Sequence, residues 1–336
     1  MTNRKYRATL PAVLKTLIDS SEIDSHVFMS AGFGALGPEL LQMFEDLRAN
    51  TEKPICISWL SPPAGIAETL AERGVLAFDQ HARAIRAMGH LVRYAADKRH
   101  RIRHRPKAAT PFAWADVIDI AAARKVVCED IAARILELAG LPVARGHLAK
   151  TTEEAVRAAD DVGYPVAIKA ISAAITHRAA AGLVKLNVEN ADAVARANRA
   201  LRDRAAELGA ALEGIWVQHM ISGGLALPVT AFRDRQFGIM VGGGIGGGMT
   251  EIIDDIVFAR APIDADGAFD MLGRLRTIER LSALLADADR RRAADFLARF
   301  SSIVATAPWD RFTFEVNPLK LGTDEVAAVD ALVVID

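Results

Sequence analysis

Two short strand-forming runs near the C-terminal end, at residues 312–314 and 332–335, constrain the fold of this chain more than any other feature. The polar turn Lys-Leu-Gly-Thr-Asp-Glu between them predicts a β-hairpin. Such a hairpin places Glu315, Asn317 and Asp330 side by side, with the first two on one face of their strand. Hard oxygen ligands with few other protein ligands suit Mg²⁺, which takes the rest of its shell from water and substrate phosphates. A surface hairpin with ordinary polar residues is the alternative interpretation.

Four segments upstream of this hairpin carry further short motifs. They are Ala-Gly-Leu-Pro-Val at 139–143, Gly-Tyr-Pro-Val-Ala-Ile-Lys at 163–169, a loop at 172–182 containing Thr-His-Arg, and Gly-Ile-Gly-Gly-Gly-Met-Thr-Glu at 244–251. Each motif alone is weak, but their order, ending in the hairpin, resembles the ATP-grasp nucleotide-binding fold. The resemblance covers about residues 115–336. Within this fold, the sequence most resembles the branch that contains the nucleotide-diphosphate-forming acyl-CoA synthetases, such as ADP-forming acetate–CoA ligase, and the succinyl-CoA ligase β subunits.

The resemblance implies which residues bind a nucleotide and a metal. The lysine of the second motif reaches nucleotide phosphates in the family, the backbone of the strand at 216–220 reads the adenine, and the glycine loop holds phosphate through its amides. ATP or ADP is then the substrate and Mg²⁺ the cofactor, held by Asn317 and Asp330 with Glu315 beside them. The implied nucleotide-binding residues are Lys169, Val217, Gln218, Met220, Gly244, Gly246, Gly247 and Glu251.

The loop at 172–182 implies a catalytic role for His177, with Arg178 holding the phosphate. An imidazole can accept a phosphoryl group and pass it on, which divides one difficult transfer into two easier ones. The family usually has Thr-Asp where this chain has Ala179 and Ala180, and a glutamate near the position of Ala226. These differences keep open a degenerate member that binds nucleotide as a regulatory or structural subunit.

Gly242, Gly244 and Gly247 also fit a dinucleotide-binding pattern. A dinucleotide site requires a helix and then a parallel strand after these glycines. Acidic residues crowd the following turn and Pro262 interrupts the segment, so phosphate binding by backbone amides is the favoured interpretation.

The first hundred residues alternate strands and helices, with strands expected at residues 26–30, 54–59 and 75–78. This pattern predicts a small parallel sheet. The segment resembles the later half of the flavodoxin-like CoA-ligase domain of the same family. We therefore expect an α/β and α+β chain, in which a partial flavodoxin-like domain at 1–95 and a basic linker at 96–113 precede a two-lobed ATP-grasp domain at 114–336. One helix is expected over residues 116–139.

Net charge and composition limit the partners and the cellular location that we expect for this chain. The net charge of −1 gives no global attraction to nucleic acid or to an anionic membrane. We find no apolar stretch long enough to predict a signal peptide or a membrane helix. The two cysteines lack metal-site spacing and fit a reducing compartment, so a cytoplasmic location is expected.

The resemblance implies an acid–thiol ligase subunit for the reaction acyl-CoA + ADP + phosphate ⇌ carboxylate + CoA + ATP, with phosphohistidine as the intermediate. The expected partner is a CoA-binding subunit that carries the principal phosphohistidine, because that part of the family's machinery is absent here. Self-association of the chain is left open. An ATP-grasp ligase that joins a carboxylate to an amine is a further alternative.

Overall fold

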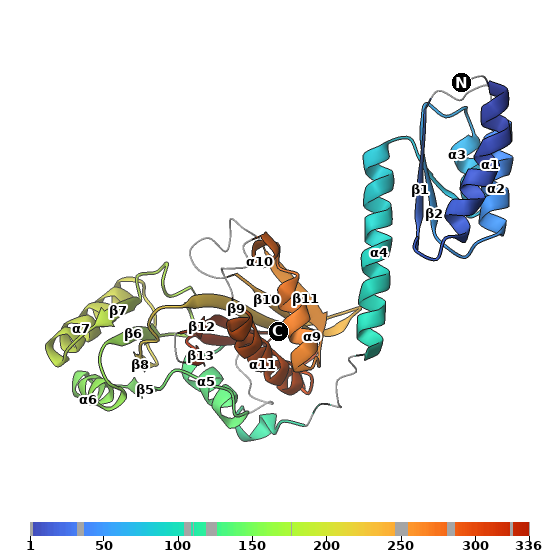
Figure 1. Ribbon diagram of the computed structural model, residues 1–336. Coiled ribbons are helices and arrows are strands. Elements are labelled where there is room, and N and C mark those ends of the chain that lie inside the picture. Colours follow the sequence, from blue (N-terminus) through green and yellow to red (C-terminus); the bar gives the residue numbers. More distant parts are fainter. Residues whose placement is uncertain are drawn as a thin grey trace. The chain divides into compact units, whose positions relative to one another are not determined.

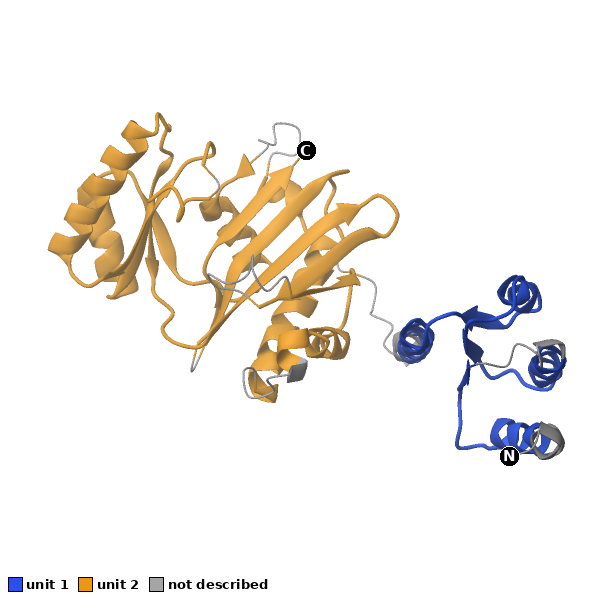
Figure 2. Cartoon of the chain, turned by 90° about the horizontal axis from the view of Figure 1, so that it is seen from above, with its two compact units in different colours: residues 1–103 blue, residues 104–336 orange. Residues whose placement is uncertain are grey.

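A computed structural model describes residues 3–31, 37–103, 109, 111–118, 126–175, 177–245, 255–280, 286–322 and 325–335. The chain divides into two compact units, residues 1–103 and 104–336 (Figure 2). Among the described residues, no helix is both long enough and apolar enough to span a bilayer.

The first unit is a three-stranded parallel sheet in the order β1-β2-β3, as the alternating pattern predicts. Helices cover both faces of this sheet. On one face α1, α2 and α3 pack against β2, with Phe44 of α2 and Leu70 of α3 buried there. On the other face α4 packs against Cys56 of β2. Because the central strand β2 is covered on both sides, its residues are apolar almost without interruption. The elements are α1 (Asn3–Asp19), β1 (His26–Ala31), α2 (Gly37–Ala49), β2 (Ile55–Leu60), α3 (Ile66–Glu72), β3 (Leu76–Phe78) and α4 (His81–Arg103).

Helix α4 extends into the segment predicted to be a linker. The predicted linker begins at residue 96, and the helix continues to Arg103. Lysine and arginine have good helix propensity, and the proline that could interrupt the helix comes only at residue 106. Low apolar content in the first part of this segment is therefore compatible with a helix.

The second unit contains two lobes, each built on its own sheet (Figure 1). In the first lobe an antiparallel sheet runs in the order β5-β8-β6-β7, and α6 and α7 cover one face of it. Helix α6 begins at a capping box in which Thr151 and Glu154 satisfy each other's backbone amides. The elements are β5 (Gly146–Ala149), α6 (Thr152–Val162), β6 (Val166–Ile171), β7 (Val184–Val188), α7 (Ala191–Glu207) and β8 (Gly214–His219).

The second lobe is a larger sheet in the order β11-β10-β9-β12-β14-β4, with β13 also pairing with β12. The core lies between this sheet and its helices, where Phe296, Phe300 and Phe314 are fully buried. The elements are β4 (Val126–Val127), α5 (Glu129–Leu138), β9 (Leu225–Asp234), β10 (Gly238–Gly244), β11 (Ile256–Arg260), α9 (Ala265–Gly273), α10 (Arg276–Arg280), α11 (Asp287–Val304), β12 (Phe312–Leu321), β13 (Val326–Ala328) and β14 (Ala331–Ile335).

Two expectations need correction in this lobe. The single helix over 116–139 is wrong, because β4 pairs with β14 and α5 begins only at Glu129. Val126 and Val127 fit the apolar helical spacing of the segment 116–139, but in the fold they pair with strand β14 instead. The dinucleotide alternative is also wrong, because β10 is antiparallel to both of its neighbours, β9 and β11.

The predicted C-terminal hairpin is confirmed. Strand β12 is antiparallel to β13 and β14, and it pairs Glu315 with Leu332. Along β12 the side chains alternate, so Phe314 and Val316 enter the core while Glu315 and Asn317 are exposed on the other face.

Candidate functional site

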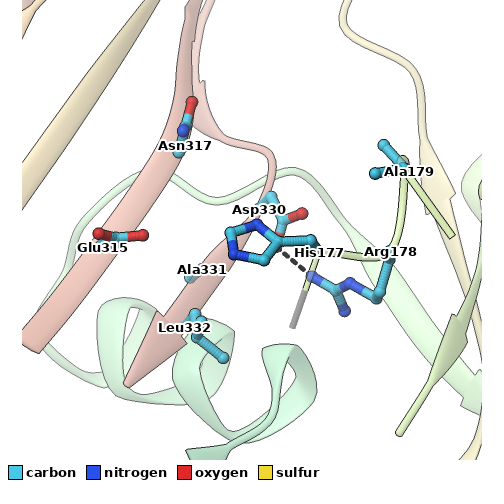
Figure 3. Close-up of a pocket in the computed structure, with 9 residues that line it drawn as sticks. His177, Arg178, Ala179, Glu315, Asn317, Asp330, Ala331 and Leu332 are labelled. Carbon is cyan, nitrogen blue, oxygen red and sulfur yellow. Dashed lines mark hydrogen bonds and ion pairs between the residues drawn. The ribbon is translucent and has the colours of Figure 1, made fainter. Parts of the chain in front are cut away.

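A cavity of about 310 Å³ lies where the loop after β6 meets the C-terminal hairpin (Figure 3). One side comes from the first lobe and the other from β12 and β14 of the second lobe. Residues more than 130 positions apart in the sequence therefore line one space. They are His177, Arg178, Ala179, Ala180, Glu315, Asn317, Asp330, Ala331 and Leu332.

The hairpin wall carries the three residues that the sequence predicts as metal ligands. Glu315 and Asn317 project from the same strand, and the backbone amide of Asn317 donates a 2.9 Å hydrogen bond to the carbonyl of Asp330. Two carboxylates and one amide oxygen form a hard donor set of the kind that Mg²⁺ takes. Among the described residues, no cluster of three or more His, Cys, Asp or Glu side chains could hold a metal by itself. A cation here would therefore need the amide of Asn317 and oxygens from water or phosphate.

The opposite wall is the turn that carries His177 and Arg178. The carbonyl of His177 accepts a hydrogen bond from the amide of Ala181, and that of Arg178 accepts one from Leu183. The His177 imidazole is exposed, whereas the Arg178 guanidinium is buried and bonds to Asp330. The structure thus brings the predicted phosphate carrier and the predicted metal ligands to one cavity.

A chain of four alternating charges leads to the cavity wall; Lys169, Glu129 and Arg178 are buried, and Asp330 is half-buried. Lys169 is 4% exposed, and its Nζ lies 2.6 Å from Oε1 of Glu129 and 2.7 Å from the carbonyl oxygen of Val329. Glu129 also lies 2.8 Å from Arg178 through its other oxygen, and Arg178 in turn bonds to Asp330. Lys169 lies on an internal strand, because β6 lies between β8 and β7 in the sheet.

Burial sets the acid–base behaviour of this chain of charges. Loss of solvent raises the pKa of the Glu129 carboxyl above its ordinary value, although Lys169 and Arg178 oppose the change. Burial alone would lower the pKa of Arg178, but the carboxylates of Glu129 and Asp330 outweigh it and raise that pKa. The arginine therefore stays a cation, as its high intrinsic pKa also requires.

Sequence reasoning missed Glu129. A glutamate in the first turn of a helix is usually explained by the helix dipole, so its residue type and position alone do not mark it as buried. The apolar helical spacing around it was the available signal, since a glutamate on the covered face of a helix needs a buried partner.

Of the remaining predicted nucleotide residues, Val217, Gln218, Met220 and Gly244 are described by the structure, and none of these four lines the cavity. Val217 and Gln218 belong to β8, with Val217 in the first-lobe core, and Met220 follows that strand on the way to β9. The amide of Gln218 bonds to the carbonyl of Ala144. The segment thus joins the two lobes, as predicted. Gly244 ends β10, whereas Gly246, Gly247, Glu251 and Thr176 lie outside the described residues.

With this geometry in place, comparison with known proteins identifies the second unit. A family model for the ATP-grasp domain matches residues 120–335. The chain belongs to the ATP-grasp family. The two-lobed ATP-grasp fold expected from the motif order is thereby confirmed.

Two curated relatives of this ATP-grasp chain are acyl-CoA ligases. The β subunit of acetate–CoA ligase (ADP-forming) I from Pyrococcus furiosus is 30% identical over 218 residues, which cover 64% of this chain and 94% of the relative. The 4-hydroxybutyrate–CoA ligase (ADP-forming) of Nitrosopumilus maritimus is 25% identical over 311 residues, covering 87% of this chain and 43% of the relative. The second match extends into the first unit and belongs to a much longer protein.

A solved structure shows the same fold. Acetyl-coenzyme A synthetase 1 of Ca. Korarchaeum cryptofilum aligns over 63% of this chain and 94% of that chain, with a TM-score of 0.58 at 27% identity in its complex with coenzyme A and Ca-AMPCP. Its complex with coenzyme A and Mg-AMPPCP, which has a phosphohistidine segment pointing towards the nucleotide binding site, gives a TM-score of 0.52 at 25% identity. The solved structure that has this fold therefore holds a nucleotide analogue, and its aligned region corresponds to about two thirds of this chain.

Proposed function

We propose that this chain is the nucleotide-binding, phosphoryl-transferring subunit of an ADP-forming acyl-CoA synthetase, with the overall reaction acyl-CoA + ADP + phosphate ⇌ carboxylate + CoA + ATP. The observation that carries the proposal is the shared cavity, in which an exposed histidine from one lobe faces two carboxylates and an amide from the other. Membership of the ATP-grasp family and similarity to β subunits of such ligases support it.

Each side chain has a part in this proposal. Glu315, Asn317 and Asp330 would hold Mg²⁺, which neutralises phosphate charge when bound. Lys169 and the glycine loop would hold the nucleotide phosphates, and the segment from Val217 to Met220 would contact the base. Catalysis would then depend on position and charge more than on covalent chemistry by other residues.

The transfer itself requires one unprotonated imidazole nitrogen. In the direction of ATP use, a lone pair of His177 attacks the γ-phosphorus, the P–N bond forms, and the bond from phosphorus to the β,γ-bridging oxygen breaks. ADP leaves with the electron pair, and the ring keeps the proton on its second nitrogen. Arg178 would stabilise the transferred phosphoryl group.

A partner chain would complete the reaction. Among the described residues of the first unit, no further strand pairs with the outer edges of β1 and β3, and Met29 and Leu76 on these strands are each more than half exposed. Open edges with apolar side chains are commonly covered by another chain. We propose a CoA-binding subunit as that partner, in a cytoplasmic complex that suits two free, buried cysteines. Co-purification from the native host should recover such a chain, and full acyl-CoA synthesis by this chain alone would contradict the partner.

Phosphoryl transfer is tested by incubation with γ-labelled ATP and the partner. Acid-labile, base-stable label should appear on this chain and disappear in His177→Ala. His147→Ala is the matched control, because His147 lies on β5 of the same lobe with its side chain more than half exposed. Label that persists in His177→Ala would place the carrier elsewhere. Tight nucleotide binding without label on either chain would favour the regulatory alternative.

The metal assignment is tested by calorimetry with Mg-ADP. Asp330→Ala should weaken binding at least about tenfold, because an anionic ligand worth ~1.4 kcal/mol or more is lost. Asp310→Ala serves as the control, since Asp310 is exposed just before β12. Equal affinity in wild type and Asp330→Ala would refute the metal site.

A further inference from the structure

Glu129 occupies an unusual place for a carboxylate. It is the first residue of α5 and is 1% exposed, and the preceding residue, Cys128, provides no side-chain cap. A buried carboxylate needs cationic partners or several hydrogen bonds, since removing an unpaired charge from water is strongly unfavourable. Both partners that the structure gives it belong to the proposed site.

These partners are the two cations of the site. One carboxylate oxygen of Glu129 lies against Lys169 at 2.6 Å and the other against Arg178 at 2.8 Å. Each cation has a second contact: Lys169 donates to the Val329 carbonyl, and Arg178 donates to Asp330. Glu129 therefore connects a strand of the first lobe, the His177 loop and the hairpin of the second lobe.

Arg178 is shared between two anions, and this sharing has a consequence. Arg178 is only 8% exposed, so water compensates poorly for a lost partner. If the charge of Glu129 were removed, Asp330 would be the remaining carboxylate in contact with Arg178 among the described residues. No second carboxylate would then compete with Asp330 for Arg178. In a poorly solvated site the attraction between these two charges is strong. Asp330 would be held more tightly by an internal cation.

We propose that Glu129 is a positioning residue: by holding one side of Arg178, it limits the grip of this arginine on Asp330 and leaves Asp330 available to a divalent cation. The inference rests on the proposed function, because it takes Asp330 as a metal ligand. Arg178 is then both a neighbour of the phosphate carrier and a competitor of the metal, and Glu129 sets the balance between these roles.

A purely structural role for Glu129 makes a different prediction. In that case Glu129→Gln would loosen the site in general, and a second substitution at Arg178 would worsen the defect. If Glu129 acts by restraining Arg178, removal of the arginine must relieve the effect. The two substitutions and their combination form a double-mutant cycle that separates the two explanations.

The experiment measures ADP affinity by calorimetry in excess Mg²⁺ and again in EDTA, on the full chain. The ratio of the dissociation constant in EDTA to that in Mg²⁺ reports how much the metal strengthens ADP binding. Protein contacts to the nucleotide that do not involve the metal cancel in this ratio. Glu129→Gln should lower this ratio about tenfold, the effect of one charge-assisted contact. Arg178→Ala should raise the ratio, and the double variant should resemble Arg178→Ala. The control is Glu137→Gln, an exposed position on the same helix.

The outcomes separate this inference from the proposed function. A wild-type ratio of one would refute the metal site and the inference together. A clear wild-type ratio that Asp330→Ala abolishes but Glu129→Gln leaves unchanged would overturn the inference alone. A double variant as weak as Glu129→Gln would assign Glu129 a structural role. If Glu129→Gln fails to fold, Arg178→Ala still decides, because an unchanged or lowered ratio in that variant removes the competition on which the inference depends.

Discussion

Replacing Lys169 by methionine tests the buried charge chain at its inner end. Methionine retains most of the lysine's aliphatic volume, so the substitution removes the charge without opening a large cavity. Glu129 would lose its 2.6 Å partner, and the Val329 carbonyl would lose its 2.7 Å donor. Breaking a buried ion pair by removing one member costs about 3–5 kcal/mol. Because Arg178 still contacts Glu129, we expect the lower end of this range, about 3 kcal/mol.

The assay is amide hydrogen exchange of peptides that cover β6, followed by mass spectrometry on the full chain. Exchange through opening of this lobe should accelerate more than about a hundredfold, since each 1.4 kcal/mol corresponds to a factor of ten. Lys185→Met is the matched control, because Lys185 is exposed on β7 opposite Ile168 in β6. An exposed lysine should change stability by less than about 0.5 kcal/mol.

A second substitution makes the test stricter. In Lys169→Met combined with Glu129→Gln, the uncompensated carboxylate is gone, so part of the lost protection should return. Exchange in Lys169→Met that matches the Lys185→Met control would refute the reasoning, because it would mean that the ion pair contributes nothing to this lobe.

Three further predictions follow from other contacts. Gly224→Ala should lower the free energy of unfolding in urea by more than about 3 kcal/mol, because the new Cβ would overlap the Leu321 carbonyl. Gly209→Ala is the control: Gly209 has a similar positive φ but open space around it, so this substitution should cost only about 1 kcal/mol. Equal costs would contradict the clash. Burial would raise the pKa of Asp255, but hydrogen bonds from the 276–277 segment lower it overall, so Asp255→Asn should cost about 2 kcal/mol near neutral pH. That cost should disappear as the pH falls through the lowered pKa, and an unchanged cost at about pH 3 would be inconsistent with this linkage. Burial chiefly raises the pKa of Cys128 to about 12, so its thiol should react with a disulfide reagent at mildly alkaline pH only after denaturation, and rapid modification of the native chain would disprove its protection.

Much of this architecture could be read from local sequence patterns. The alternation of strands and helices in the first unit, the capping box of α6 and the C-terminal hairpin all depend on residues that are neighbours in the chain. Side-chain period and turn chemistry are local properties, and they remain visible without the fold. The hairpin also predicted that Glu315, Asn317 and Asp330 lie together.

The tertiary structure decided what the local patterns left open. The phosphate roles predicted for Lys169 and Arg178 stay predictions, but the partners of these two cations could not be predicted. Nζ of Lys169 bonds to Glu129, 40 positions away, and Arg178 bonds to Asp330, 152 positions away. Val127 was expected in a helix and instead pairs with Val333. The sequence by itself therefore determined the strands and helices of the first unit, the C-terminal hairpin and the chemical groups at the site, because period, turns and residue type are local properties. Only the packing of the two lobes determined which charge neutralises which, since a buried ion takes its partner from whatever the fold brings within a few ångströms, however distant in the chain.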